Sequence, residues 1–249
     1  MNNTKTTYDL IGDVHGCFDE LNSLCAKLGY DYSNELGFFV PTPDRMAIFV
    51  GDLIDRGPDN ARVFDQVMTW IRMSAALCVR GNHDDKFARW CRGKNVIINH
   101  GLQTTIDQIN DFGWDRSAIA EIIELMPQYL SLDAGRLIVV HAAWHEGLKD
   151  FDPLSKSCRS YCLYGPTTGL DTDGMPRRID WVAQHPTATD RDPIIVYGHA
   201  VYDRVRIFNK TYGIDTGCVF GGSLSCLSYP QLTITSVRAR STYASLAKI

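Results

Sequence analysis

Side chains of the kinds that bind divalent metals stand at the ends of five short apolar runs of the chain. They are Asp13 and His15 after 8–11, Asp52 after 46–50, Asn82 and His83 after 75–79, His141 after 137–140, and His199 after 193–197. Ligand sites in open α/β sheets form beyond the carboxyl ends of strands, so these groups can meet at one site. Carboxylate, imidazole and amide ligands suit Mn, Fe, Zn or Ni better than a thiolate-loving ion.

The candidate ligands outnumber what one ion requires. Two aspartates, one asparagine and three histidines fit a pair of ions ~3.5–4 Å apart that share one carboxylate. Such a pair clamps the oxygens of a phosphoryl group and lowers the pKa of a bound water. An arginine beside the pair can hold phosphate oxygens in a bidentate manner, and a histidine that is not a ligand can protonate a departing alkoxide. These residue types therefore predict phosphoester hydrolysis.

The elements that must position these groups alternate between strand and helix in the early part of the chain. Apolar residues recur at helical spacing over 18–28, 63–71 and 101–127, between the runs that end in candidate ligands. Later segments at 212–214, 224–227 and 232–237 have the pattern of short strands. We therefore expect one α/β domain over residues 1–249, with a central β structure and helices outside.

The stretch 145–191 has weak periodicity and many turn residues, which indicates a long surface excursion. For its arginines we expect a solvated face, with substrate contact as the alternative; these are Arg159, Arg177 and Arg178. Aromatic residues in and beside the stretch suit either stacking on a nucleobase or anchoring of the loop, and both interpretations stay open. They are Trp144, Tyr161, Tyr164 and Trp181.

Composition narrows the class of protein. The 249 residues are 45% hydrophobic and 22% charged, which is typical of a globular chain. A net charge of -4 argues against broad non-specific nucleic-acid binding, which needs a basic surface. No apolar run approaches the ~20 residues of a membrane span and no export signal is visible, so we expect a cytoplasmic protein without a membrane partner. The eight cysteines form no C-x-x-C pair, and we expect free thiols.

Five segments, in order, resemble the PPP-type (calcineurin-like) metallophosphatases. They are G-D-V-H-G at 12–16, G-D-L-I-D-R-G at 51–57, R-G-N-H-D at 80–84, V-V-H-A at 139–142 and Y-G-H at 197–199. Segments at 92–102, 163–169 and 214–222 are similar to the phosphatase module of bacterial polynucleotide kinase–phosphatase and to PrpE-type enzymes, which cleave diadenosine tetraphosphate asymmetrically. The resemblance spans about 8 to 237 and implies a calcineurin-like α/β fold, a central β sandwich flanked by helices.

The resemblance also implies a role for each motif residue. One metal ion would be bound by Asp13 and His15, the second by Asn82, His141 and His199, and both by Asp52. Arg56 would hold the phosphate, His83 would be the general acid oriented by Asp55, and Asp215 would have a supporting role. Two divalent ions are implied, with Mn²⁺ expected and Fe, Ni or Zn as alternatives.

Three positions depart from the family pattern without removing a metal ligand. Asp84 stands where Glu is usual, Ala143 where Gly is usual, and Ala200 where Thr is usual. Residues behind the ligands tune a metal site, so Asp84 and Ala200 can alter substrate preference.

The implied activity is hydrolysis of phosphate esters or anhydrides by attack of a metal-bound hydroxide. The narrower resemblance favours nucleotide substrates, either diadenosine tetraphosphate or phosphates at nucleic-acid ends. A protein serine/threonine phosphatase acting on phosphoproteins is the alternative, because the broader family uses the same site for that reaction. A metal-dependent dinucleotide-binding module is the alternative from another class, although pure binding needs no proton donor such as His83.

Overall fold

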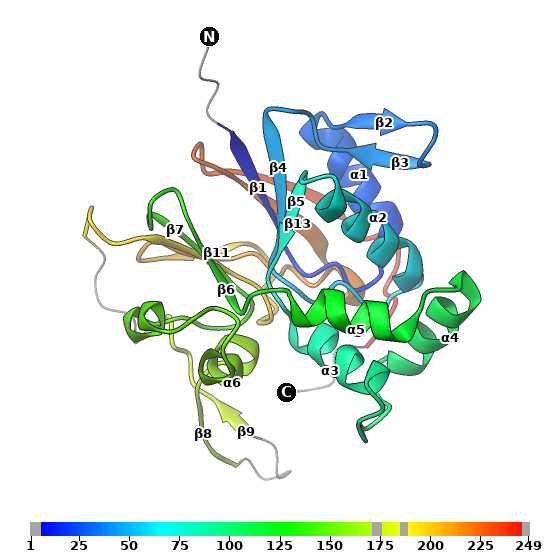
Figure 1. Ribbon diagram of the computed structural model, residues 1–249. Coiled ribbons are helices and arrows are strands. Elements are labelled where there is room, and N and C mark those ends of the chain that lie inside the picture. Colours follow the sequence, from blue (N-terminus) through cyan, green and yellow to red (C-terminus); the bar gives the residue numbers. More distant parts are fainter. Residues whose placement is uncertain (1–5, 171–175, 185–188, 246–249) are drawn as a thin grey trace.

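Two five-stranded sheets form the centre of the computed structural model, which describes residues 6–170, 176–184 and 189–245 (Figure 1). The first sheet has the order β14-β13-β1-β4-β5, with β14 (Thr233–Arg238), β13 (Ser223–Tyr229), β1 (Thr7–Ile11), β4 (Arg45–Phe49) and β5 (Ala76–Cys78). The second has the order β11-β12-β10-β7-β6, with β11 (Arg206–Phe208), β12 (Thr211–Gly213), β10 (Ile194–Tyr197), β7 (Leu137–Val140) and β6 (Tyr129–Leu132).

Helices and two hairpins surround the sheets. The helices are α1 (Phe18–Leu28), α2 (Asn60–Arg72), α3 (Asn82–Cys91), α4 (Leu102–Phe112), α5 (Arg116–Glu124) and α6 (Lys156–Tyr164), with short 3-10 turns at Glu146–Asp150 and Cys218–Phe220. The hairpins pair β2 (Asp31–Ser33) with β3 (Phe38–Val40), and β8 (Thr167–Leu170) with β9 (Pro176–Arg178). In Figure 1, α1 to α5 gather beside the first sheet, and α6 with the β8–β9 hairpin lies beside the second.

Consecutive residues of the inner strands are buried on opposite faces, which explains their unbroken apolar runs. Leu10 of β1 packs between the sheets with Val139 of β7 and Val196 of β10. The next residue, Ile11, lies in the other core, beneath α1 and α2. Both faces of the first sheet are thus covered, as the pattern of a buried strand requires. The expected β sandwich flanked by helices is confirmed.

Parallel pairing brings the carboxyl ends of the inner strands to common edges. β1 pairs in parallel with β4, and β4 with β5. In the second sheet β7 and β12 flank β10, both in parallel. The loops after these strands carry the motif residues, and they converge where the two sheets meet.

Two expectations about the elements were wrong. The segment 101–127 is not one helix, because Gly113 ends α4 in a left-handed conformation (φ 79°) and the carboxylate of Asp115 accepts a hydrogen bond from Ala118 N at the start of α5. The stretch 145–191 is more than a surface excursion. Its helix α6 buries Cys158 and Cys162 against Ile195 on the outer face of the second sheet.

The expectation of free thiols is confirmed. All eight cysteines are free thiols. Within the part of the chain that the structure describes, none of the helices is both long and apolar enough to cross a bilayer.

Candidate metal centre

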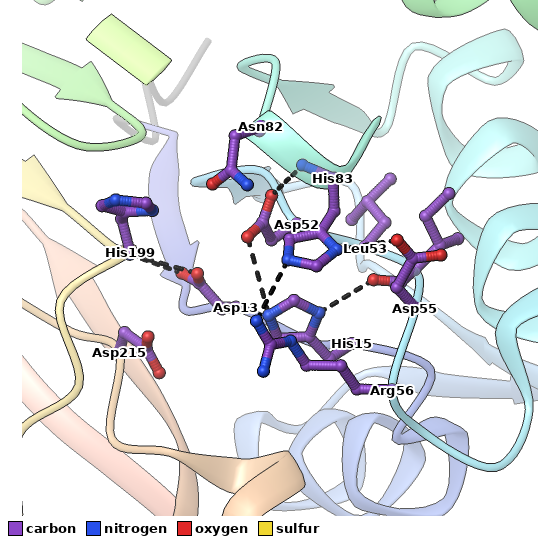
Figure 2. A network of polar contacts seen from close by, with 12 residues as sticks. Asp13, His15, Asp52, Leu53, Asp55, Arg56, Asn82, His83, His199 and Asp215 are labelled. Atoms are coloured by element: carbon purple, nitrogen blue, oxygen red, sulfur yellow. Dashed lines mark hydrogen bonds and ion pairs between the residues drawn. The ribbon is translucent and has the colours of Figure 1, made fainter. Parts of the chain in front are cut away.

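Five motif residues adopt the left-handed backbone conformation that side chains other than glycine rarely take. The φ angles are 45° at His15, 50° at Asp52, 72° at Asp55, 69° at Arg56 and 65° at His199. Each such residue costs on the order of 1–3 kcal/mol unless its surroundings hold it, and such strain clusters at functional sites. The turns after β1, β4 and β10 therefore bend sharply to turn these side chains toward one another (Figure 2).

Asp52 lies at the centre of the cluster, between two histidines. Its Oδ2 is 3.6 Å from His15 Nε2 and its Oδ1 is 3.5 Å from His141 Nε2. The backbone N–H of His83 donates to the same Oδ1 at 2.9 Å. Gly81 makes this approach possible, because a Cβ there would stand 2.1 Å from Asp52 N. The carboxylate of Asp52 thus faces two separate sets of potential metal ligands, one at His15 and one at His141.

The histidines present unprotonated Nε2 atoms to this carboxylate. Nδ1 of His15 donates to Ile54 O, and Nδ1 of His141 donates to Val50 O, each at 2.8 Å. Burial lowers the pKa of His15 to about 3 and also lowers the pKa of His141. Both rings are therefore neutral, with the Nε2 lone pair turned inward. Neutral imidazole held through its other nitrogen is the form that binds metal ions.

The contact between His141 and Asn82 supports a cation at this place. His141 Nε2 lies 3.0 Å from Asn82 Oδ1. The ring proton of His141 is on Nδ1, where it is hydrogen-bonded to Val50 O, so Nε2 and Oδ1 are both acceptors. His199 Nε2 is also buried and has no hydrogen-bond partner among the residues that the structure describes. The rings of His141 and His199 are 4.9 Å apart between centroids. A divalent ion satisfies these lone pairs together, so the residues present fit a metal.

Two further aspartates add negative charge to the cluster. Both carboxylate oxygens of Asp13 accept from His199 N, at 3.3 and 3.1 Å, and Asp215 Oδ1 accepts from Gly217 N at 3.0 Å. Burial, together with the charges of Asp215 and Asp52, raises the pKa of Asp13 well above its usual value. Burial likewise raises the pKa of Asp215 to about 7. Crowded buried carboxylates of this kind are typical of a site that receives cations.

His83 belongs to a relay beside the cluster. Its Nδ1 donates to Asp55 Oδ2 at 2.7 Å, and Thr105 Oγ1 donates to Asp55 Oδ1 at 2.6 Å. Burial alone would lower the pKa of His83, but Asp52 and Asp55 outweigh it and raise the pKa above the usual histidine value. Arg56 Nη2 lies 3.3 Å from His83 Nε2. The imidazole of His83 and the guanidinium of Arg56 therefore lie next to each other beside the cluster.

The structure places all ten predicted site residues in this one region. Ligand atoms of His15, Asp52 and His83 lie within 4.8 Å of one another, as do those of Asp52, His141 and His199. Figure 2 shows Asp13, Asn82 and Asp215 around the same centre. Asp55 and Arg56 stand on the His83 side.

Asp84, one of the three residues that depart from the family pattern, holds the loop that carries Asp52. Its carboxylate accepts from three backbone N–H groups, those of Asp52 at 2.8 Å, Leu53 at 3.1 Å and Gly81 at 3.0 Å. Asp84, whose side chain is shorter than the usual glutamate, therefore fixes the backbone of Asp52 directly.

We expect Asp84→Ala to lower the free energy of unfolding by at least about 2 kcal/mol, because it leaves three buried donors without their acceptor. Urea denaturation in the presence of a chelator measures this change without a contribution from bound metal. Replacing the exposed Asp203 with alanine is the matched control, and it should shift stability by no more than about 0.5 kcal/mol. Equal stability of the two variants would show that the carboxylate of Asp84 does not hold the loop.

Arg178, at the end of β9, is exposed, as expected, and it also borders the cluster. It lines a cavity together with His199, and its charge adds to burial in lowering the pKa of that histidine. Its guanidinium makes no ion pair with any residue that the structure describes. Arg159, by contrast, pairs with Asp85, with Nε 2.8 Å from Oδ1. No local pattern identifies Arg178, because its position depends on how the β8–β9 hairpin folds back.

Comparisons with known proteins show the family and the fold of the chain. The family described as calcineurin-like phosphoesterase matches residues 6–226. The bis(5'-nucleosyl)-tetraphosphatase PrpE (asymmetrical) of Halalkalibacterium halodurans is 38% identical over 94% of each chain. The protein of the same name from Anoxybacillus flavithermus is 40% identical, over 95% of this chain and 96% of its own. A solved structure provisionally assigned as a diadenosine tetraphosphatase has a TM-score of 0.63 at 20% identity, over 96% of both chains, which shows the shared fold.

Proposed function

Because the chain belongs to the calcineurin-like phosphoesterase family, we propose that its substrate is a dinucleoside polyphosphate of the diadenosine tetraphosphate type. The chain is a hydrolase of this family. The names of relatives that are 38% and 40% identical along nearly their whole length carry the proposal for the substrate.

We propose that the cluster around Asp52 holds two divalent ions. Asp13, His15 and Asp52 would hold the first ion; Asp52, Asn82, His141 and His199 would hold the second. The facing atoms His141 Nε2 and Asn82 Oδ1 support this assignment, since one cation satisfies both lone pairs. Mn²⁺ fits the mixture of imidazole and carboxylate ligands. When bound, such a pair polarises the phosphoryl oxygens and makes a water acidic enough to act as a nucleophile.

The residues of the chain itself would orient the phosphate and supply a proton. Among the described residues, the buried Nε of Arg56 has no hydrogen-bond partner and the guanidinium of Arg178 makes no ion pair, so both would hold phosphate oxygens. His83 keeps its ring orientation through Asp55 and presents Nε2 to the leaving oxygen. Asp215 would support the site from the loop before Gly217.

A panel of substrates with Mn²⁺ tests this function. It contains diadenosine tetraphosphate, a 2′,3′-cyclic nucleotide, a nucleoside monophosphate and a phosphoserine peptide. We expect diadenosine tetraphosphate to have the highest kcat/KM and to yield ATP and AMP in equal amounts, because asymmetrical cleavage adds water across an outer anhydride. Two molecules of ADP would contradict asymmetrical cleavage. A higher kcat/KM on the phosphoserine peptide would point to the protein phosphatase instead.

A further inference from the structure

Two cavities lie next to each other on the side of the cluster that α6 and the β8–β9 hairpin cover. The inner cavity, about 300 Å³, reaches His199 and is lined by Arg178, Tyr164 and Arg206. The outer cavity, about 320 Å³, is lined by aromatic side chains, those of Trp144, Tyr161 and Trp181. Pro166 and Trp181 line both cavities, so the two are adjacent.

The two cavities differ in the positive charge that they offer to a phosphate. Arg178 lines the inner cavity and makes no ion pair with a described residue, whereas Arg206 there pairs with Asp180, with Nη2 2.7 Å from Oδ2. The described residues that line the outer cavity include no lysine or arginine; of its two carboxylates, Glu146 pairs with Lys149 and Asp192 accepts hydrogen bonds from Thr189. A phosphate is therefore favoured in the inner cavity over the outer one. The outer cavity suits an uncharged group attached to that phosphate.

The aromatic walls are held in position by the strands that carry the candidate ligands. Trp181 Nε1 donates to Ala142 O at 3.0 Å, in the residue directly after His141. The Trp181 ring also stands edge-on to Tyr197 of β10, at 5.2 Å between centroids. Tyr161 packs edge-on against His145, at 4.8 Å. Rings fixed before a ligand arrives cost little further ordering when it binds.

The outer cavity is within reach of the cluster. Trp144 follows His141 by three residues, so their Cα atoms are at most about 11 Å apart. The cavity volume of about 320 Å³ lies within the usual range of small-ligand sites, about 300–1,000 Å³. A flat aromatic group of bicyclic size, joined through a sugar to a phosphate in the inner cavity, matches the distance, the walls and the charge.

We propose that the outer cavity binds a nucleobase of the substrate by stacking on Trp181 and Tyr161, while the attached phosphates lie along Arg178 toward the cluster. This inference rests on the proposed function, because it assigns the base of that nucleotide substrate to a place. Gln184 lines the same cavity, and its amide carries both a donor and an acceptor that suit the edge of a base.

Binding of two ligands that share a phosphate portion tests the site. One is α,β-methylene-ADP, and the other is methylenediphosphonate, which lacks the nucleoside; isothermal titration calorimetry with Mn²⁺-loaded protein gives both Kd values. Stacking on aromatic side chains predicts that the nucleoside improves the Kd by about tenfold or more. The ratio of the Kd of methylenediphosphonate to the Kd of α,β-methylene-ADP measures what the nucleoside contributes. This ratio cancels any change in metal occupancy that a substitution causes.

Variants of the aromatic walls identify where the nucleoside binds. Tyr161→Ala and Trp181→Ala should each lower this ratio by about fivefold or more, and Tyr161→Phe should preserve it, since the ring remains. Tyr32→Ala, at an exposed aromatic of β2, is the matched control and should keep the wild-type ratio. Thermal melts identify a variant that fails to fold. Quenching of tryptophan fluorescence by adenosine, retained in Tyr161→Phe and weakened in Tyr161→Ala, then provides a second measurement.

The outcomes separate the two proposals. A wild-type ratio near one, or a ratio that both alanine variants leave unchanged, would overturn the nucleobase site even if diadenosine tetraphosphate is cleaved. A ratio that falls in the alanine variants upholds the site even if diadenosine tetraphosphate proves a poor substrate, in which case the proposed substrate alone fails. Tight binding of a phosphoserine peptide that both alanine variants weaken, with no preference for the nucleoside, would assign the cavity to a protein partner instead.

Discussion

Asp52→Asn is expected to reduce turnover on diadenosine tetraphosphate by about a thousandfold and to remove most of the stabilisation of the fold by Mn²⁺. One carboxylate oxygen of Asp52 faces His15 and the other faces His141. An amide carries no charge and offers one oxygen in place of two. Loss of the shared ligand weakens both ion sites at once, and metal clamps contribute several kcal/mol to phosphoryl transfer.

Turnover and stability are measured on the same preparations of this variant. Chelation should abolish wild-type turnover and Mn²⁺ should restore it. An ion that binds only the folded state adds about 2.7 kcal/mol of stability at a hundredfold excess over its Kd, so wild-type melts with and without Mn²⁺ should differ by several degrees. The melts of Asp52→Asn should nearly coincide, and Asp203→Asn, at an exposed aspartate, should behave as wild type. Near-normal turnover of Asp52→Asn would rule out the two-metal arrangement.

The centre of the site could be predicted because strand ends determine it. Asp13, Asp52 and His141 each follow an apolar run that forms a buried strand. Parallel pairing of β1 with β4 brings the first two ends together, and the packing of the two sheets brings the end of β7 to them. The local pattern therefore carries the information that positions these residues in space.

The surroundings of the site could not be predicted in the same way. Arg178 and Trp181 reach the cluster only because α6 packs on the second sheet and the β8–β9 hairpin returns beside it. The buried face of α6 is short and consists largely of Cys158 and Cys162, which give a weak amphipathic signal. Long-range packing, which no short window of sequence contains, thus determines which groups face the substrate.

His83→Ala is expected to lose about 10²–10⁴-fold in kcat on a substrate whose leaving oxygen is strongly basic, such as the ribose alkoxide of a nucleoside monophosphate. Its Nδ1 is held by Asp55 at 2.7 Å, which leaves Nε2 to carry the transferred proton. On p-nitrophenyl phosphate the loss should be far smaller, because nitrophenolate leaves without a proton. The difference between the two losses therefore isolates proton donation from every other role of the ring.

The controls for His83→Ala must separate chemistry from metal occupancy, since His83 N also donates to the central Asp52. Both kinetic constants are compared on protein saturated with Mn²⁺, with bound metal counted for each variant. Tyr32→Ala, at an exposed ring outside the cluster and both cavities, is the matched control and should change neither constant. Asp55→Asn should reproduce the leaving-group dependence in weaker form, because the amide orients the ring without stabilising its charge. Equal losses of His83→Ala on both substrates would instead indicate that His83 positions the phosphate or the metals, and the proton donor would then have to lie elsewhere.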